Sequence, residues 1–161
     1  MRISLKSSDL FNYKLENISL NYVSSHKQVG LYYDCKMIFD HQIDEIVKKS
    51  HKKFYLLKNI CKRVDYQTFL KLFNVYILPI LEYSNLSFVL NESQNLKIES
   101  IQRKITKYLC FKAGKTDFNY ENRLKFLGLE KLEKRRKIQI LKQLFKIKNK
   151  GLWPLSMEEG I

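Results

Sequence analysis

The sequence has few of the residues that form linkers or disulfide scaffolds, and it has no long apolar run. Its 161 residues include only five glycines and two prolines, which leaves little room for flexible linkers. The three cysteines, Cys35, Cys61 and Cys110, are odd in number and far apart, as is typical of reduced thiols inside a cell. No apolar run approaches the length of a membrane span. These absences predict one folded core in the nucleus or the cytoplasm, with no membrane partner.

Patterns typical of an enzyme or a metal site are missing as well. The sequence contains no Cys-x-x-Cys pair, no Gly-x-Ser-x-Gly and no glycine-rich phosphate loop. His26, His41 and His51 have no partner at metal-ligand spacing, so exposed or core histidines are the simpler interpretation. The sequence therefore predicts no catalytic residues, no cofactor, no metal and no small-molecule substrate.

Positive charge is what the sequence has in abundance. Lys and Arg number 30 against 16 Asp and Glu, a net charge of +14, and residues 97–150 carry 17 of the basic and five of the acidic side chains. Aromatic residues make up 13% of the chain, too many for a disordered basic tail. This balance favours phosphate contacts over a merely solvated surface. The predicted contacts are Lys48, Lys49, Lys52, Lys53, Lys58, Lys62 and Arg63 in a first helix, Arg103, Lys104 and Lys107 in a third, and Arg135 and Arg136 in a fifth. Tyr32, Tyr33 and Tyr55 are open to two interpretations, stacking on nucleic acid and packing in the core.

The N-terminal residues are expected to form a small β-ribbon. Residues 13–23 alternate apolar and polar side chains about a Glu16-Asn17 turn, which is typical of a hairpin. A third strand is expected over residues 27–33, where Gly30 permits a bulge or a close approach of another backbone. Two or three strands alone are marginally stable, so the ribbon is either the edge of a larger sheet or packs on the helices after it.

From Phe39 the apolar residues recur at helical spacing, and about five helices are expected. The first covers residues 39–61, and the second begins at the N-cap Asp65 and continues to about Val89. The third begins at Asn91 or Ser93 and turns Leu96, Ile101, Ile105 and Leu109 inward. The fourth covers residues 119–127 and ends at Gly128, and the fifth covers residues 130–150, with Leu132, Ile138, Leu141, Leu144, Phe145 and Ile147 as its apolar residues. The predicted fold class is mainly α, a helical bundle preceded by a small antiparallel hairpin.

Pro79 and Glu82 interrupt the most apolar stretch, residues 76–89. A proline inside a helix removes one backbone hydrogen bond and costs about 3 kcal/mol, so the second helix must kink or break at Pro79. Glu82 then either reaches the surface or needs a basic partner within the fold.

Four segments, taken in order, resemble one protein family. They are "HKQVGLYYDCKMIFDHQIDEIVKKSHK", "LPILEYSNLSFV", "IESIQRKITKYLCF" and "YENRLKFLGLEKLEKRRKIQILKQLFKIKNKG". They are similar to the C-terminal part of jockey-like non-LTR retrotransposon reverse transcriptases, where K-x-L-G-V and D-x-K-L-x-F segments are followed by R-P-x-L-E-Y, an I-E-x-x-Q-R helix and an L-x-x-R-R helix. The chain departs from the pattern at Val29, at Leu78 in place of the arginine before Pro79, and at Ser87-Phe88, where a tryptophan is common.

The resemblance implies a position within a polymerase rather than a whole polymerase. Residues 1–35 would correspond to the palm edge and primer grip, residues 36–151 to the helical thumb, and residues 152–161 to a tail. Lys27 and Gly30 would then lie beside the primer, and the partners would be a template–primer duplex, RNA/DNA hybrids included, and a catalytic palm region missing from this chain. "YYDC", residues 32–35, has only Asp34 where the family pairs two aspartates, so Asp34 is more simply the aspartate of the D-x-K-L segment.

The expected function is that of a fragment of an RNA-directed DNA polymerase which binds nucleic acid and is not an enzyme as an isolated chain. Two alternatives stay open, a basic helical module that docks an acidic protein partner and a transposon relic without a selected function. A helix-turn-helix DNA reader is disfavoured, because no compact helix pair with a short glycine turn is present. A steep fall of affinity with salt would favour nucleic acid over an acidic protein.

Overall fold

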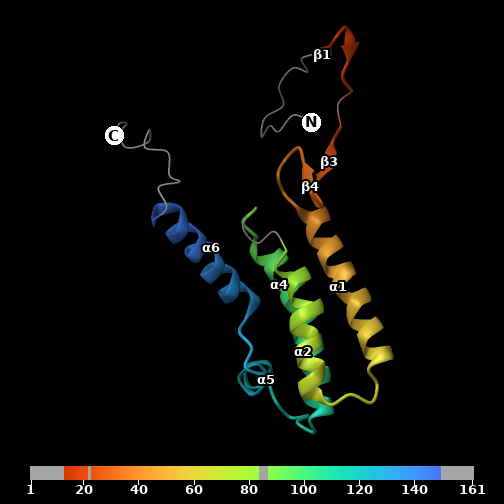
Figure 1. The fold of residues 1–161 in the computed structure, drawn as a ribbon, viewed down its shortest axis with the longest axis vertical. Coiled ribbons are helices and arrows are strands. Elements are labelled where there is room, and N and C mark those ends of the chain that lie inside the picture. The colour runs from red at the N-terminus through yellow and green to blue at the C-terminus, as the bar shows by residue number, and fades with distance from the viewer. Residues whose placement is uncertain (1–12, 22, 84–86, 150–161) are drawn as a thin grey trace. The chain divides into compact units, whose positions relative to one another are not determined.

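The computed structural model describes residues 13–21, 23–83 and 87–149 (Figure 1). These residues form five helices of eight or more residues, a four-residue helical turn and two pairs of short antiparallel strands. The predicted fold class, mainly helical with a small β-ribbon in front, is confirmed. The chain divides into two units, Met1–Glu45 and Ile46–Ile161, a boundary further along than the expected one at residue 35. The expected tail, residues 152–161, lies outside the described residues.

The N-terminal unit contains two hairpins rather than three strands. β1 (Lys14–Leu15) pairs with β2 (Ile18–Ser19), and Glu16 and Asn17 form the predicted turn with φ angles of 48° and 67°. β3 (Ser25–Gln28) pairs with β4 (Leu31–Asp34). The single strand expected over residues 27–33 is wrong, because Val29 and Gly30 adopt φ angles of 48° and 80° and turn the chain back on itself. Gly30 therefore serves a two-residue turn and not a bulge.

The Asp34 carboxylate organises the loop that leads from β4 into the first helix. It accepts backbone N–H bonds from Lys36 at 2.9 Å, from Ile38 at 3.1 Å and from Phe39 at 2.9 Å. Partial burial would raise the pKa of Asp34, but these N–H groups lower the pKa on balance. Asp34 is thus occupied by its own loop.

Three aromatic rings join the first helices of the helical unit. They are Phe54 of α1 (Asp40–Ile60), Phe69 of α2 (Tyr66–Tyr76) and Tyr108 of α4 (Glu92–Lys112). Phe54 and Phe69 meet edge to face at 6.4 Å between ring centroids, and Tyr108 lies 5.7 Å from the first and 5.1 Å from the second. Such edge-to-face contacts are the favoured geometry of aromatic cores. The continuous buried set around them consists of Phe73, Ile77, Leu81, Ile98, Ile101, Ile105 and Leu109.

Pro79 separates two helices. The Asp65 carboxylate caps α2 by accepting N–H bonds from Gln67 at 2.9 Å and Thr68 at 3.1 Å, which confirms the predicted cap. α3 is a four-residue turn, Leu78–Leu81, with Pro79 in its first turn, where a helix N–H has no helical partner. The break at Pro79 is confirmed, whereas the continuation to Val89 is wrong because α3 ends at Leu81.

α4 contacts α2, α5 and α6 (Figure 1). Its buried apolar residues are Ile98, Ile101, Ile105, Leu109 and Cys110. Its first turn is a capping box, since Asn91 Oδ1 accepts the Gln94 N–H at 2.8 Å and Gln94 Oε1 accepts the Asn91 N–H at 3.1 Å. This confirms one of the two predicted starting points. Leu96, expected inward, is instead 56% exposed.

The last two helices follow α4. α5 (Tyr120–Leu127) starts at Asn119 and ends at Gly128, which has the left-handed φ of 64° predicted for a helix C-terminus. α6 (Leu132–Asn149) contacts α4, and Leu132 and Arg136 are its buried residues. The apolar residues further along α6 do not join the core, because Leu141 and Phe145 are 64% and 66% exposed.

Candidate nucleic-acid interface

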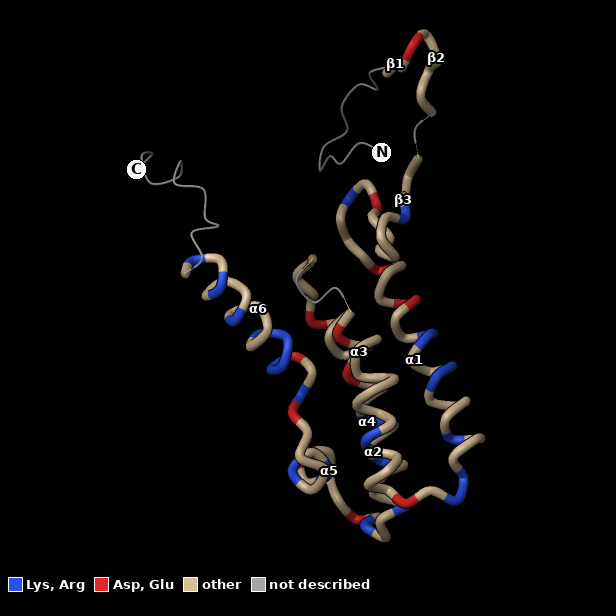
Figure 2. The backbone as a smooth tube through the Cα atoms, viewed as in Figure 1, with Lys and Arg blue, Asp and Glu red and all other residues tan. Residues whose placement is uncertain are grey.

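The second half of α1 and the turn after it carry basic residues and no acidic ones. Residues 46–64 include six lysines and one arginine and no aspartate or glutamate, and Figure 2 shows this positive charge along α1. Ile46, Ser50 and Phe54 are buried, so the basic residues occupy the remaining sides of the helix. The exposed ones are Lys48, Lys49, Lys52, Lys58, Lys62 and Arg63.

The second half of α4 is also basic, and it lies along the second half of α1. Residues 100–116 contain five basic and no acidic residues. Lys104 Nζ donates a hydrogen bond to the Tyr55 hydroxyl at 2.8 Å, and one turn further along both helices Lys58 Nζ lies 5.2 Å from the centre of the Tyr108 ring. Contacts in this order show that α1 and α4 are parallel, so their basic C-terminal halves are neighbours.

Lys112 of α4 makes a further contact between the two helices, at the C-terminal end of α1. Its ammonium donates to the carbonyl oxygens of Lys62 at 3.1 Å and Cys61 at 3.4 Å, and also to that of Val64. A lysine at the last carbonyls of a helix satisfies unpaired acceptors and meets the negative end of the helix dipole. We call Tyr55, Lys58, Lys104, Tyr108 and Lys112 the basic cluster.

The positive charge of the basic cluster is not neutralised within the described part of the chain. Lys58, Lys104 and Lys112 form no ion pair there, and the cluster contains no carboxylate. The hydrogen bond from Lys104, then the charges of Lys104 and Lys58, lower the pKa of Tyr55, a member of the cluster. The pKa of nearby His51 is lowered mainly by burial, and the charge of Lys104 adds to that shift. The Tyr55 shift is the one expected where positive charge favours an anion.

The contacts predicted from the sequence fall into several groups. Lys58 and Lys104 belong to the basic cluster, and Lys48, Lys49, Lys52, Lys62, Arg63 and Lys107 are exposed on α1, the turn after it and α4. Lys53 Nζ lies 5.8 Å from the Tyr76 ring centre, and the Arg103 guanidinium lies 4.9 Å from that of Tyr120. Lys27, whose Nζ lies 4.8 Å from the Tyr32 ring centre, and Gly30 belong to the N-terminal unit.

Arg135 and Arg136 have internal partners instead of a solvent face. Arg135 Nε donates to Glu82 Oε1 at 2.5 Å, which joins α6 to the end of α3. Arg136 is only 7% exposed and donates to Asn95 Oδ1 at 2.6 Å. The expectation that both arginines lie on the solvent side of the helix is therefore wrong for Arg136. Glu82 therefore has a basic partner within the fold, Arg135, which was one of the two outcomes predicted for it.

Two residues of the basic cluster, Tyr108 and Lys112, are absent from the predicted contacts. Lys104, Tyr108 and Lys112 are four residues apart, which places them on one side of a helix. Tyr55 and Lys58 are three apart and share a side of α1 in the same way. This spacing was a usable signal for Tyr108 and Lys112, but it could not show that α1 and α4 are parallel.

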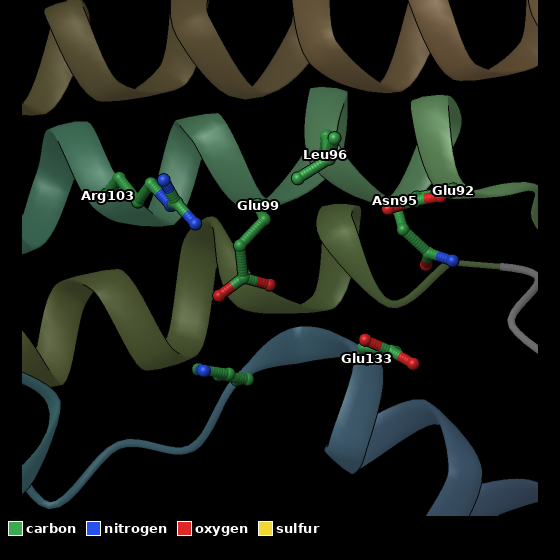
Figure 3. A pocket seen from close by; sticks show the side chains of 7 residues that line it. Glu92, Asn95, Leu96, Glu99, Arg103 and Glu133 are labelled. Carbon is green, nitrogen blue, oxygen red and sulfur yellow. The ribbon is translucent and has the colours of Figure 1, made fainter. Parts of the chain in front are cut away.

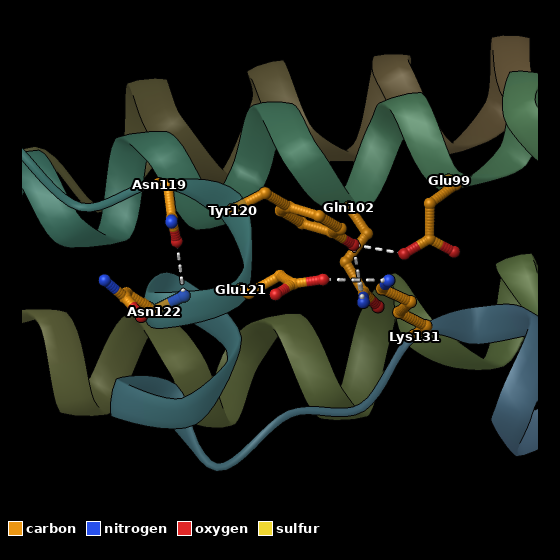
Figure 4. A network of polar contacts seen from close by, with 7 residues as sticks. All are labelled: Glu99, Gln102, Asn119, Tyr120, Glu121, Asn122 and Lys131. Carbon is orange, nitrogen blue, oxygen red and sulfur yellow. Dashed lines mark hydrogen bonds and ion pairs between the residues drawn. The ribbon is translucent and has the colours of Figure 1, made fainter.

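A separate polar network joins α4, α5 and α6 (Figure 4). The Tyr120 hydroxyl donates to Glu99 Oε1, and Glu99 Oε2 accepts the Leu132 N–H at 3.0 Å. Gln102 Nε2 donates to the Glu130 carbonyl at 2.9 Å. Burial, then the hydrogen bond to Glu99, raises the pKa of Tyr120, so its hydroxyl stays protonated as a donor. The acidic and amide residues of the I-E-x-x-Q-R segment thus hold the start of α6 in place.

An open cleft of about 390 Å³ lies beside this network (Figure 3). It is lined by Glu92, Asn95, Leu96, Glu99, Arg103, Lys131 and Glu133. Most of its charged groups have partners in the chain: Tyr120 for Glu99, the Tyr120 ring for Arg103, Glu121 at 3.3 Å for Lys131 and Lys137 at 2.7 Å for Glu133. The cleft therefore offers fewer unpaired charges to a ligand than the basic cluster does.

In comparisons with known proteins, no family model, no curated protein and no solved structure matches the chain. The similarity to jockey-like reverse transcriptases stays a prediction from the four segments. Among the described residues, no helix combines the length and the apolar character that crossing a bilayer requires. The same residues include no group of three or more His, Cys, Asp or Glu side chains placed to hold a metal ion.

Proposed function

We propose that the chain is a thumb-like, nucleic-acid-binding part of a non-LTR retrotransposon reverse transcriptase. In this proposal it holds a template–primer duplex and leaves nucleotidyl transfer to a palm region outside this chain. The observation that supports the proposal most is the basic cluster, three ammonium groups from two parallel helices without a carboxylate among them. The order of the four resembling segments supports the choice of family.

The dimensions of the basic cluster suit a phosphate backbone. Lys104 and Lys112 are eight residues apart on α4, or about 12 Å along the helix. A duplex rises about 3.4 Å per base pair along its axis, so this distance matches the rise of three to four base pairs. Lysines contact phosphates as point charges and release counterions when they do so, which gives affinity without base recognition. The proposed binding therefore tolerates any sequence and weakens steeply with salt.

The test measures how the affinity for a fluorescein-labelled RNA/DNA hybrid and for duplex DNA depends on salt. Lys58→Gln/Lys104→Gln removes two charges of the basic cluster, and Lys71→Gln/Lys125→Gln removes two exposed charges of α2 and α5 as the matched control. Losing two phosphate contacts should lower the slope of log affinity against log salt by about 1.8, whereas the control should change it by less than about 0.5. Thermal unfolding of both variants checks that each retains the fold.

Two outcomes would contradict the proposal. Equal slope losses in the two variants would mean that total charge matters and the basic cluster does not. A wild-type affinity for the hybrid that is flat in salt, together with capture of an acidic protein, would favour the docking module instead.

A further inference from the structure

Phe111 lies in the last turn of α4 with its ring in solvent. It is 69% exposed, and within the described residues its ring contacts no other aromatic ring and no cation. Phe118 and Phe126, further along the chain, instead meet edge to face at 5.8 Å between ring centroids. One exposed apolar side chain is ordinary on a protein surface. What Phe111 can bind therefore depends on the residues that surround it.

The exposed side chains next to Phe111 on its side of α4 are basic. Lys104 and Lys107 precede Phe111 by seven and four residues, which places them within about 40° of it around the helix. Both lysines are exposed, and Lys107 forms no ion pair or hydrogen bond with the described residues. Residues 100–116 include no aspartate or glutamate. We call Lys104, Lys107 and Phe111 the α4 stripe, in which an exposed ring follows two cations.

A second exposed ring lies at the other end of the α4 stripe. Lys104 Nζ donates to the Tyr55 hydroxyl at 2.8 Å and lies 5.0 Å from the centre of the Tyr55 ring, and Tyr55 is 46% exposed. Phe111 follows Lys104 by about 10 Å along the helix axis. Surfaces that bind single-stranded nucleic acid combine these two kinds of group, because their cations follow the phosphates while their aromatic rings stack on bases.

The chemistry of the α4 stripe selects among possible partners. A second copy of this chain would bring its own net charge of +14 and would be repelled. A lipid surface binds helices that have a broad apolar side, whereas the exposed side of residues 100–112 offers only the ring of Phe111 among polar and basic residues. A nucleotide supplies a flat base for the ring and a phosphate for the lysines. Bases inside a duplex are covered on both faces by their neighbours, so only an unpaired base is open to Phe111.

We propose that Phe111 stacks on an unpaired base where the bound duplex passes into a single strand, while Lys104 and Lys107 contact the phosphates beside that base. This inference rests on the proposed function and adds which form of nucleic acid the same surface prefers, a hybrid with a single-stranded extension over a blunt one. Every base has a face that can stack, so the preference does not depend on the sequence of the extension.

The experiment measures the affinity of the full chain for fluorescein-labelled RNA/DNA hybrids by fluorescence anisotropy. One hybrid is blunt, and the others carry an extension of about six nucleotides at the 5′ or the 3′ end of the DNA strand. Each extended hybrid is also made with an abasic extension, which keeps the phosphates and removes the bases. Wild type should bind the base-bearing extension about tenfold more tightly than the abasic one at one end or both, since both have the same charge.

Substitutions of Phe111 identify the group that is responsible. Phe111→Ala should bind the base-bearing and abasic hybrids alike, with an affinity for the blunt hybrid within about twofold of wild type. Phe111→Trp should keep the preference, whereas Phe111→Leu, which is apolar but has no ring, should lose most of it. Phe145→Ala is the matched control and should keep the preference, since Phe145 is also on a helix and is 66% exposed. Thermal unfolding checks that each variant retains the fold.

Several results would overturn the inference. They are equal wild-type affinities for the base-bearing and abasic extensions at both ends, a preference that survives Phe111→Ala, a full preference in Phe111→Leu, and a loss in Phe145→Ala as large as that in Phe111→Ala. Binding to phosphatidylserine vesicles that Phe111→Ala abolishes, with the extension preference intact, would assign the ring to a lipid surface. A steep salt slope on the blunt hybrid without any extension preference rejects this inference and leaves the proposed function standing. A flat slope, or no binding to any hybrid, rejects both.

Discussion

The ion pair between Glu82 and Arg135 offers a sharp test of how α6 is attached. The two residues lie 53 positions apart in the sequence, and Arg135 Nε approaches Glu82 Oε1 to 2.5 Å. We expect the neutral substitutions Glu82→Gln and Arg135→Gln to be coupled, because each removes the same contact between α3 and α6. The double variant should therefore lose less stability than the sum of the two single variants.

The size of the coupling follows from the exposure of the two side chains, which is 33% for Arg135 and 17% for Glu82. Fully exposed pairs contribute about 0.2–1 kcal/mol, and hydrogen bonds to charged groups in partly buried sites contribute about 1.5–3 kcal/mol. A pair that is partly screened by water should fall between these limits, at about 1–1.5 kcal/mol. Lys134 and Glu130 supply an internal control, since they form a pair of the same length with exposures of 64% and 43%. Its coupling should be only about 0.3–0.5 kcal/mol.

The assay is urea unfolding followed by circular dichroism. For each pair, wild type, the two single variants and the double variant form a double-mutant cycle, and each cycle gives one coupling energy. The linear dependence on urea must have the same slope in all proteins, so that the free energies of unfolding can be compared. A Glu82–Arg135 coupling no larger than that of Lys134 and Glu130 would refute the reasoning. The attachment of α6 would then depend on Leu132 and Arg136 rather than on this pair.

Two further predictions concern Leu81 and Asp34. Leu81 is 1% exposed, so Leu81→Ala should lower the free energy of unfolding by about 2–5 kcal/mol, and a change within error of wild type in urea unfolding would show that the run around Pro79 is not core. The pKa of Asp34 is lowered from its usual 3.8, so its stabilisation of the loop is complete above the unfolded-state pKa and is lost as pH falls through the folded-state value. The NMR amide chemical shifts of Ile38 and Phe39 should therefore titrate below about pH 4, and Asp34→Asn should abolish that titration. An unchanged titration curve in the variant would show that another group causes it.

The features predicted correctly from the sequence are local ones. Asp65, Asn91 and Asn119 each bond to an N–H two or three residues away, and Gly128 needs only its own left-handed backbone. Such capping preferences depend on only a few consecutive residues, so they can be predicted without knowledge of the tertiary structure. The Glu16-Asn17 turn was predictable for the same reason.

The features that were missed depend on which helices meet. Arg136 belongs to a run of four basic residues and was expected on the surface, but the approach of α6 to Asn95 of α4 buries it. Leu96 has the spacing of an inward residue and is nevertheless exposed, because it lines the open cleft beside Lys131 and Glu133. Helical spacing tells which residues share a side of a helix and says nothing of which side another helix covers. The continuation of the second helix to Val89 failed for a different reason. An apolar run does not by itself show that a helix continues, and Val89 lies outside any helix and is 91% exposed.

The residues that carry the family resemblance and the residues that carry the proposed function are largely different sets. Glu99 and Gln102 of the I-E-x-x-Q-R segment bind Tyr120, Leu132 and Glu130, and the two arginines of the L-x-x-R-R segment bind Glu82 and Asn95. These side chains build the joint between α4, α5 and α6. Lys58, Lys104 and Lys112 are not part of those motif letters, and their proximity comes from the parallel alignment of α1 and α4. A chain could therefore keep the motifs for the stability of the bundle and lose its affinity for phosphates, or the reverse. For this reason the salt slope of the Lys58→Gln/Lys104→Gln variant bears on nucleic-acid binding, whereas the Glu82–Arg135 cycle bears on the fold alone.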